Sequence, residues 1–171
     1  MGRNTGHLAL YSGMAGAAAI ILIPESPFDI GQVVAQLERR SRYARYDILV
    51  VAEGAKTIDG SEKSNGGIGR YLEAKLKEMT GREVRYQNPG HQQRGAYPNA
   101  FDTVMGRLMA LHAVRLVKDK QFGYMVSRQN GRLTEVALND VAASGFKKVP
   151  AEQYDSKRLN ASRSAQGFMQ F

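Results

Sequence analysis

The chain has 171 residues, of which 43% are hydrophobic and 23% are charged, a composition typical of a folded globular domain rather than a disordered segment. It contains no cysteine, which excludes a disulfide scaffold and any thiolate metal site. The formal net charge of +8 is compatible with an anionic partner but does not identify one.

No segment has the pattern of a membrane helix. The longest apolar run, residues 14–23, is shorter than the roughly 20 residues that spanning a bilayer requires. The densest basic cluster, residues 38–45, is typical of a solvated helix end, where cations offset the helix dipole. Only the net charge would support a nucleic-acid-binding domain, because the sequence has no recognisable helix-turn-helix and no alternation of aromatic and basic residues. We therefore expect a cytoplasmic protein whose partners include neither a membrane nor nucleic acid.

The N-terminal part of the chain alternates helical and strand patterns. Small and apolar residues at helical spacing predict a helix over 6–18, and the β-branched run after it predicts a buried strand over 20–25. Residues 27–41 have the apolar face of an amphipathic helix, with Asp29 as a possible N-cap. A second apolar run predicts a strand over 47–55.

The middle of the chain continues this alternation. A helix is expected from Ile68 to a C-cap at Gly81, then a short strand over 82–87. A long helix is expected over 99–118. We expect it to bury one stripe of apolar side chains, formed by Val104, Met105, Leu108, Leu111, Val114 and Leu116 or Val117.

A hairpin and a short helix are expected toward the C-terminus. Residues 122–138 predict two strands joined at Asn130 and Gly131, a strong hairpin-turn pair. A short helix near 139–144 and a loosely ordered end over 160–171 follow. The order of elements predicts an α/β fold with a parallel β-sheet flanked by helices.

Polar residues follow the predicted strands, at the carboxyl ends where ligands bind in parallel α/β sheets. Glu53 ends the second strand, and its carboxylate suits sugar hydroxyls, although a cap or surface ion pair is an equal alternative. Glu25 sits similarly, with the structural alternative favoured. Arg85, His91 and Arg94 offer donors suited to a phosphate, but three exposed loop residues would give the same pattern.

Neither a metal site nor a catalytic centre is predicted. The three histidines, His7, His91 and His112, are far apart, and no histidine or carboxylate pair has ligand spacing. The Gly-rich stretch at 66–70 lacks the Lys-Ser/Thr of a P-loop and is interpreted as a linker. No residue is therefore assigned a catalytic or metal-binding role.

Several stretches match, in order, the signatures of one family. Residues 81–102, GREVRYQNPGHQQRGAYPNAFD, are similar to a G-R-E-x-R and G-H-x-Q-R-G-G-x-P signature. Residues 1–10, MGRNTGHLAL, resemble an MGR-x-x-G-x-L-A segment. The shorter matches are IPE, VVAEGA, HAVRLV and VALNDVAASGFKKVP. Across nearly its whole length the chain resembles the 6-phosphofructokinases, which use ATP or pyrophosphate.

The resemblance implies a fructose 6-phosphate site. The residues expected to contact this substrate are Met1, Gly2, Arg3, Glu53, Arg85, His91 and Arg94. Among them, Glu53 would bond sugar hydroxyls, while His91 and Arg94 would hold the 6-phosphate. Arg85 would reach that phosphate in a neighbouring subunit's site, which implies a homo-oligomer.

The resemblance also implies a two-domain α/β enzyme with a subunit about twice this length, of which the chain would be the substrate-binding, C-terminal half. The phosphate-donor loop and the aspartates that act as base and magnesium ligand would precede residue 1. We therefore expect the chain alone to be inactive and to need a complementing donor-binding half. Mg²⁺ would belong to the complete enzyme, and no ligand for it is identified in this chain.

Three divisions of the chain are expected. Residues 1–98 would form the sugar-phosphate-binding α/β domain. Residues 99–138 would form the long helix and strands that in the family pack on the donor domain. The apolar stripe of the helix over 99–118 would then be exposed in this chain alone, as an alternative to the burial expected above. Residues 139–171 would form a closing helix and a loosely ordered tail.

The chain departs from the family pattern at several positions. Ala96 replaces the second Gly of the signature and would be strained if that position needs a positive φ. Pro89 and Thr103 replace the usual Leu and Arg. Ala44 falls where bacterial members place a basic residue for an effector phosphate, which leaves an allosteric site in question.

Two functions remain open. The chain is either the sugar-phosphate-binding half of a phosphofructokinase, or a non-catalytic binding or interaction protein that kept the fold and lost the reaction. The sequence does not distinguish ATP from pyrophosphate as the donor, because the deciding positions would lie in the other half.

Overall fold

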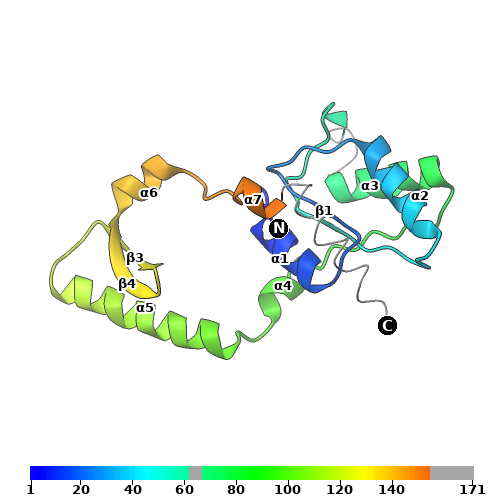
Figure 1. The fold of residues 1–171 in the computed structure, drawn as a ribbon. Helices are drawn as coiled ribbons and strands as arrows, with labels where there is room; N and C mark the ends of the chain where they lie inside the picture. The colour runs from blue at the N-terminus through cyan, green and yellow to red at the C-terminus, as the bar shows by residue number, and fades with distance from the viewer. Residues whose placement is uncertain (62–66, 155–171) are drawn as a thin grey trace. The chain divides into compact units, whose positions relative to one another are not determined.

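A computed structural model describes residues 1–61 and 67–154, and these form two compact units. The first unit comprises Met1–Asn88 together with the segment from Lys147, and the second comprises Pro89–Phe146 (Figure 1). The tail expected over 160–171 lies outside the described residues, as does Gly66 of the expected linker. The functional divisions expected at residues 98 and 138 stay a prediction.

The first unit is built on a parallel pair of strands. β1 (Ile20–Leu22) and β2 (Leu49–Val51) pair with Ile21 opposite Val50. Both strands are shorter than their apolar runs, since only three residues of each take part in the ladder. The expected α/β class with a parallel sheet is confirmed.

Helices cover both faces of this sheet. α2 (Ile30–Ser41) and α3 (Ile68–Thr80) share one hydrophobic cluster with Leu22. α1 (His7–Ala15) contributes to a second cluster, which Ile21 joins. Because successive strand side chains point to opposite faces, α1 lies on one side of the sheet and the other two helices lie on the other.

Local chemistry sets the ends of these helices where the sequence predicts it. The Asp29 carboxylate accepts hydrogen bonds from the amides of Gly31 and Gln32 at 2.6 and 3.1 Å, so it is the N-cap of α2. Gly81 ends α3 with a φ of 65°, the left-handed conformation that glycine adopts without a steric cost.

The closing segment returns to the first unit. Glu25 Oε1 accepts hydrogen bonds from the amides of Gly6 and Val149, each at 3.0 Å. His7 Nε2 lies 3.0 Å from the carbonyl oxygen of Lys147. The short helix α7 (Ala151–Tyr154) follows.

The second unit contains the expected hairpin. β3 (Tyr124–Gln129) and β4 (Arg132–Ala137) are antiparallel, and Asn130 and Gly131 join them with φ values of 49° and 84°. Positive φ at both turn residues matches the right-handed twist of the strands. The prediction from this residue pair is confirmed.

Helices precede and follow the hairpin. α4 (Gln92–Gly95) is a single turn, and α5 (Ala100–Lys118) is the expected long helix, capped by the side chain of Asn99. α6 (Leu138–Ser144) matches the expected short helix. No helix in the described ranges is both long and apolar enough to cross a membrane.

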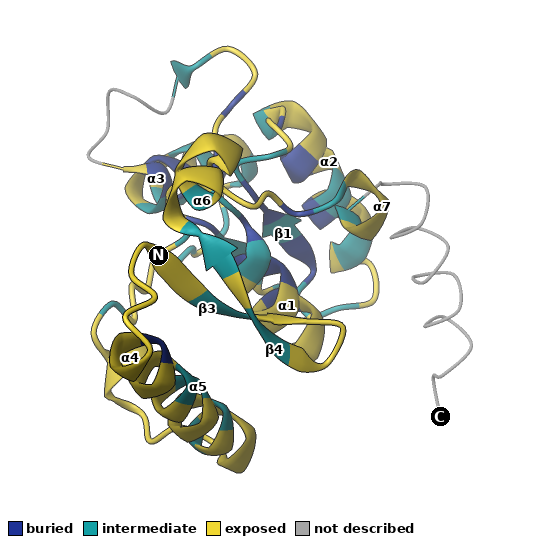
Figure 2. Cartoon of the chain, turned by 90° about the vertical axis from the view of Figure 1, so that its left-hand side faces the viewer, coloured by how far each residue is buried: buried dark blue, intermediate teal, exposed yellow. Residues whose placement is uncertain are grey.

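One sequence prediction was wrong, and one open alternative is now decided. Residues 82–87 form no regular element and belong to neither sheet, so the expected third strand is not formed. The apolar stripe of α5 is largely exposed, as Figure 2 shows, with Leu111 59% and Val114 65% exposed; Leu116 alone is buried in this described helix. Helical spacing identifies an apolar face, but burial also requires an element that covers it.

Candidate functional site

Glu53 lies just beyond the carboxyl end of β2, beside the first residues of the chain. Its Oε1 accepts a hydrogen bond from Arg3 Nε at 2.7 Å, and its Oε2 lies 3.3 Å from the Met1 amino group. Hydrogen bonding by Arg3, and then by the amino group of Met1, lowers the pKa of the Glu53 carboxyl. The carboxylate is therefore ionised at neutral pH and available to accept hydrogen bonds.

The backbone also ties residues 1–3 to this site. The amide of Glu53 donates to the Met1 carbonyl at 2.9 Å, and the amide of Gly54 donates to the Gly2 carbonyl at 3.0 Å. An added Cβ at Gly54 would lie 1.8 Å from the Arg3 carbonyl oxygen, so a side chain there would push the two segments apart. The structure thus brings Met1, Gly2, Arg3 and Glu53 together.

Arg85 belongs to the same unit but has a different partner. Its side chain is 81% exposed, and its Nε donates to Glu83 Oε1 at 2.8 Å. The residues expected at the site did not include Glu83, although in the strand expected over 82–87 a spacing of two residues would put Glu83 and Arg85 on one side. A phosphate at Arg85 would compete with this exposed carboxylate.

His91 and Arg94 lie in the second unit, on the turn that precedes α5. The amides of Arg94 and Gly95 donate to the His91 carbonyl at 2.9 and 3.0 Å, which closes the single turn of α4. Both side chains are exposed. Ala96 has a φ of −73°, so the expected strain at this position does not arise.

The unit boundary divides the predicted site residues. Met1, Arg3 and Glu53 form one group in the first unit. Arg85 belongs to the same unit and pairs with Glu83. His91 and Arg94 form a second group in the other unit. The first group contains the Glu53 carboxylate, and the second contains the Arg94 guanidinium and the His91 imidazole.

Within 1–61 and 67–154, no three His, Asp or Glu side chains gather as metal ligands would.

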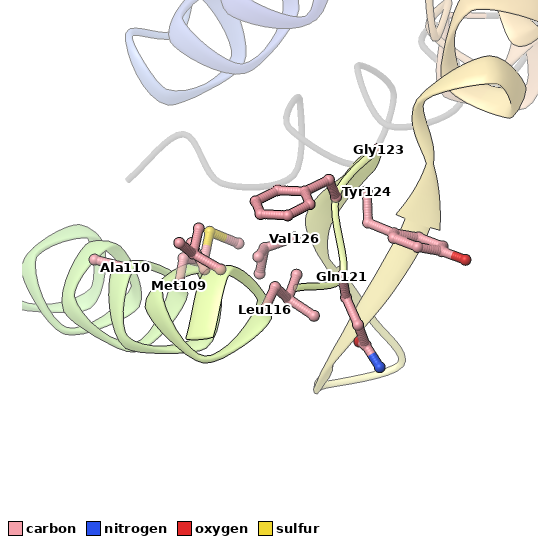
Figure 3. Close-up of a pocket in the computed structure, with 10 residues that line it drawn as sticks. Met109, Ala110, Leu116, Gln121, Gly123, Tyr124 and Val126 are labelled. Carbon is pink, nitrogen blue, oxygen red and sulfur yellow. The ribbon is translucent and has the colours of Figure 1, made fainter. Parts of the chain in front are cut away.

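A pocket in the second unit was not predicted. It has a volume of about 440 Å³ and lies between α5 and the start of the hairpin (Figure 3). Met109, Leu116 and Val126 are among the residues that line it, together with Gln121 and Tyr124. Its lining is mainly apolar, unlike a sugar-phosphate site.

Solved structures of phosphofructokinases share this fold. The T-state structure from Pichia pastoris aligns with a TM-score of 0.70 at 30% identity, over 84% of this chain and 17% of that one. A pyrophosphate-dependent phosphofructokinase from Nitrosospira multiformis aligns with a TM-score of 0.73 at 24% identity, over 88% of this chain and 40% of that one, and supports the fold alone. The chain is thus an α/β protein of the phosphofructokinase fold.

Sequence comparison gives the family. A family model described as Phosphofructokinase matches residues 1–117, and the chain belongs to this family. The pyrophosphate–fructose 6-phosphate 1-phosphotransferase of Amycolatopsis methanolica is 40% identical over 93% of this chain and 50% of its own length. The ATP-dependent 6-phosphofructokinase 3 of Streptomyces coelicolor is 40% identical over 90% of this chain and 49% of its own. The chain spans about half the length of these curated relatives.

Proposed function

We propose that this chain binds fructose 6-phosphate, as the C-terminal, sugar-phosphate-binding part of a 6-phosphofructokinase. The observation that carries the proposal is the ionised Glu53 carboxylate, held by Arg3 at the carboxyl end of β2. The curated relatives include one named for transfer to fructose 6-phosphate. A hydroxylated sugar needs such an acceptor, and its phosphate needs charged donors.

The side chains have separate roles in this proposal. Glu53 accepts hydrogen bonds from sugar hydroxyls, and Met1, Gly2 and Arg3 contact the substrate beside it. His91 and Arg94 hold the 6-phosphate. Arg85 reaches the 6-phosphate in a neighbouring subunit's site, so the proposed assembly is a homo-oligomer.

The proposal assigns phosphoryl transfer to a larger assembly. Transfer to the 1-hydroxyl needs a bound donor and charge neutralisation by a metal. We propose that a complementing half supplies both, in the cytoplasm and as a step of glycolysis. Relatives named for ATP and for pyrophosphate match at the same 40% identity, so the proposal does not name the donor.

Thermal unfolding tests the binding proposal. Fructose 6-phosphate should raise the melting temperature of the chain, because a ligand at 100 times its Kd stabilises the folded state by about 2.7 kcal/mol. Arg94→Ala should abolish the shift. Arg107→Ala removes an exposed arginine from α5 in the same unit and should retain it. Binding would be refuted if millimolar ligand produced no shift in the parent chain.

The same measurement addresses the alternative function. A non-catalytic binding protein would also show the shift, but would remain inactive when a complementing half is present. Activity in the presence of a complementing half therefore distinguishes the two functions.

A further inference from the structure

The segment 82–87 presents Arg85 to solvent without belonging to a sheet. Its side chains alternate: Arg82 and Val84 are half-buried, while Glu83 and Arg85 are exposed. In an ordinary strand the ladder hydrogen bonds fix which residues point outward, and a slip by one residue reverses every side chain. Another set of contacts must fix the register here.

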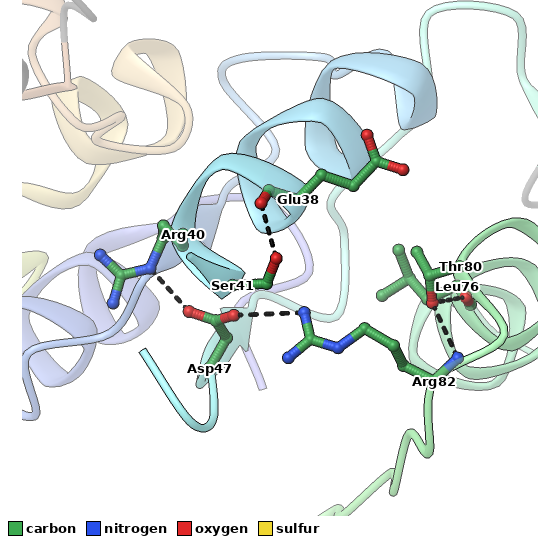
Figure 4. A network of polar contacts seen from close by, with 7 residues as sticks. All are labelled: Glu38, Arg40, Ser41, Asp47, Leu76, Thr80 and Arg82. Carbon is green, nitrogen blue, oxygen red and sulfur yellow. Dashed lines mark hydrogen bonds and ion pairs between the residues drawn. The ribbon is translucent and has the colours of Figure 1, made fainter. Parts of the chain in front are cut away.

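Asp47 provides a contact at the start of this segment. Its side chain is only 5% exposed, and Oδ1 accepts a hydrogen bond from Arg40 Nε of α2 at 2.6 Å. Its Oδ2 forms an ion pair with Arg82 Nη1 at 3.7 Å, as Figure 4 shows. A carboxylate removed from water requires compensating charges. Moving Arg82 away from Asp47 would therefore lower the stability of the folded state.

The backbone around Arg82 is held as well. The amide of Arg82 donates to Thr80 Oγ1 at 3.2 Å, and that hydroxyl donates to the Leu76 carbonyl of α3 at 2.6 Å. The left-handed Gly81 between them turns the chain out of the helix. The segment therefore begins in a defined direction.

Three further contacts hold the segment beyond Arg82. Val84 packs against the main hydrophobic cluster of the first unit. The Tyr86 ring lies against α3, so close that a Cβ added at Gly69 would be 2.1 Å from a ring carbon. The pKa of the Glu73 carboxyl of α3 is lowered chiefly by Lys77 and further by backbone hydrogen bonding from Tyr86. Arg82, Val84 and Tyr86 are thus each held against the first unit, and the Arg85 side chain between them is exposed to solvent.

We propose that Asp47 is a positioning residue for Arg85: through Arg82 it fixes the register of the 82–86 segment and so holds the Arg85 guanidinium in solvent, ready for a phosphate. The value of this device to binding rests on the proposed function. The anchor itself is a property of the first unit and can be measured without any ligand.

Thiol reactivity tests the register, because the chain has no cysteine of its own. Arg85→Cys and Val84→Cys are made separately, each in the parent and in the Asp47→Asn and Arg82→Gln backgrounds. In the parent, a thiol at 85 should react with Ellman's reagent at least tenfold faster than a thiol at 84. Loss of the Asp47–Arg82 ion pair should reduce the ratio of the two reaction rates to less than three. Each thiol would then spend part of the time exposed to solvent and part of the time buried.

Two variants serve as controls, one for misfolding of Asp47→Asn and one for the general effect of removing an ion pair. Arg82→Gln leaves Asp47 paired with Arg40, so it carries the test if Asp47→Asn does not fold. Lys75→Gln removes the exposed Lys75–Glu78 ion pair of α3 and should retain the parent ratio. A ratio unchanged in every folded anchor variant would overturn the proposal.

Binding separates this inference from the proposed function. If fructose 6-phosphate binds the parent, Arg82→Gln should weaken binding about as much as Arg85→Ala, roughly tenfold, and the double variant should be no worse. If Arg82→Gln lowered the ratio of thiol reaction rates but left the affinity for fructose 6-phosphate unchanged, the positioning role would be overturned. Absence of binding to the parent would refute the proposed function alone, while the thiol ratios would still decide the anchor.

Discussion

At the scale of single residues, Glu25 is the carboxylate that ties the closing segment to the start of the chain. One of its oxygens accepts the amides of Gly6 and Val149. Val149 is 3% exposed and Gly6 is also buried, so neither amide has ready access to water in place of this acceptor. A buried amide left without an acceptor costs about 1–3 kcal/mol.

Glu25→Ala should therefore lower the free energy of unfolding of the first unit by about 1–3 kcal/mol. Glu25→Gln should lower it less, because the amide oxygen can still accept both hydrogen bonds. Urea unfolding at pH 7 measures the difference. Equal stability of the alanine variant and the parent would show that the hydrogen bonds to Glu25 contribute nothing to stability.

The same carboxylate predicts a pH dependence. Burial acts to raise the pKa of Glu25, but the amides of Val149 and Gly6, aided by the charge of His7, outweigh it and lower the pKa. Its contribution is therefore present above the unfolded value of 4.5 and is lost as the pH falls through the folded pKa. The difference in stability between the parent and Glu25→Gln should shrink on acidification.

At the scale of elements, α2 depends on its cap. Asp29 satisfies the amides of Gly31 and Gln32, which have no acceptor within the helix. Asp29→Ala should lower the free energy of unfolding by about 1 kcal/mol. Asp29→Asn keeps an acceptor and should retain most of the stability. Thermal unfolding followed by circular dichroism measures both, and an unaltered midpoint for Asp29→Ala would contradict the capping role.

At the scale of the whole molecule, the exposed apolar face of α5 agrees with the proposal of a complementing half. Leu111 and Val114 are more than half exposed, whereas a helix with such side chains is usually covered. The curated relatives are about twice as long as this chain. The chain therefore accounts for about half of a family member by length.

The chain alone, with fructose 6-phosphate, magnesium and either ATP or pyrophosphate, should form no fructose 1,6-bisphosphate. Co-expression with the half of the Amycolatopsis methanolica relative that this chain does not match should give product in a coupled assay. Leu111→Lys with Val114→Lys should reduce that activity without lowering the melting temperature of the chain, since both side chains are exposed. Turnover by the purified chain alone would refute the need for a second half.

Local features of the fold were predictable because their causes lie within a few residues. The Asp29 cap, the left-handed Gly81 and the turn at Asn130 and Gly131 each follow from the chemistry of adjacent side chains. The strand expected at 82–87 failed because a strand exists only where a neighbouring strand pairs with it. Burial or exposure of the α5 stripe stayed open for a similar reason, since periodicity does not say what covers a helix.

The sequence by itself determined the family, most of the order of elements and the residue types of the candidate site, because each depends on short stretches of chain. Only the tertiary structure decided which of those residues have partners. Arg3 pairs with Glu53 across 50 positions, and Glu25 accepts the Val149 amide across 124. Such pairs depend on where folding brings distant segments. Asp47 shows this most clearly, because its partners come from α2 and from the segment that follows α3, and no local pattern marks it.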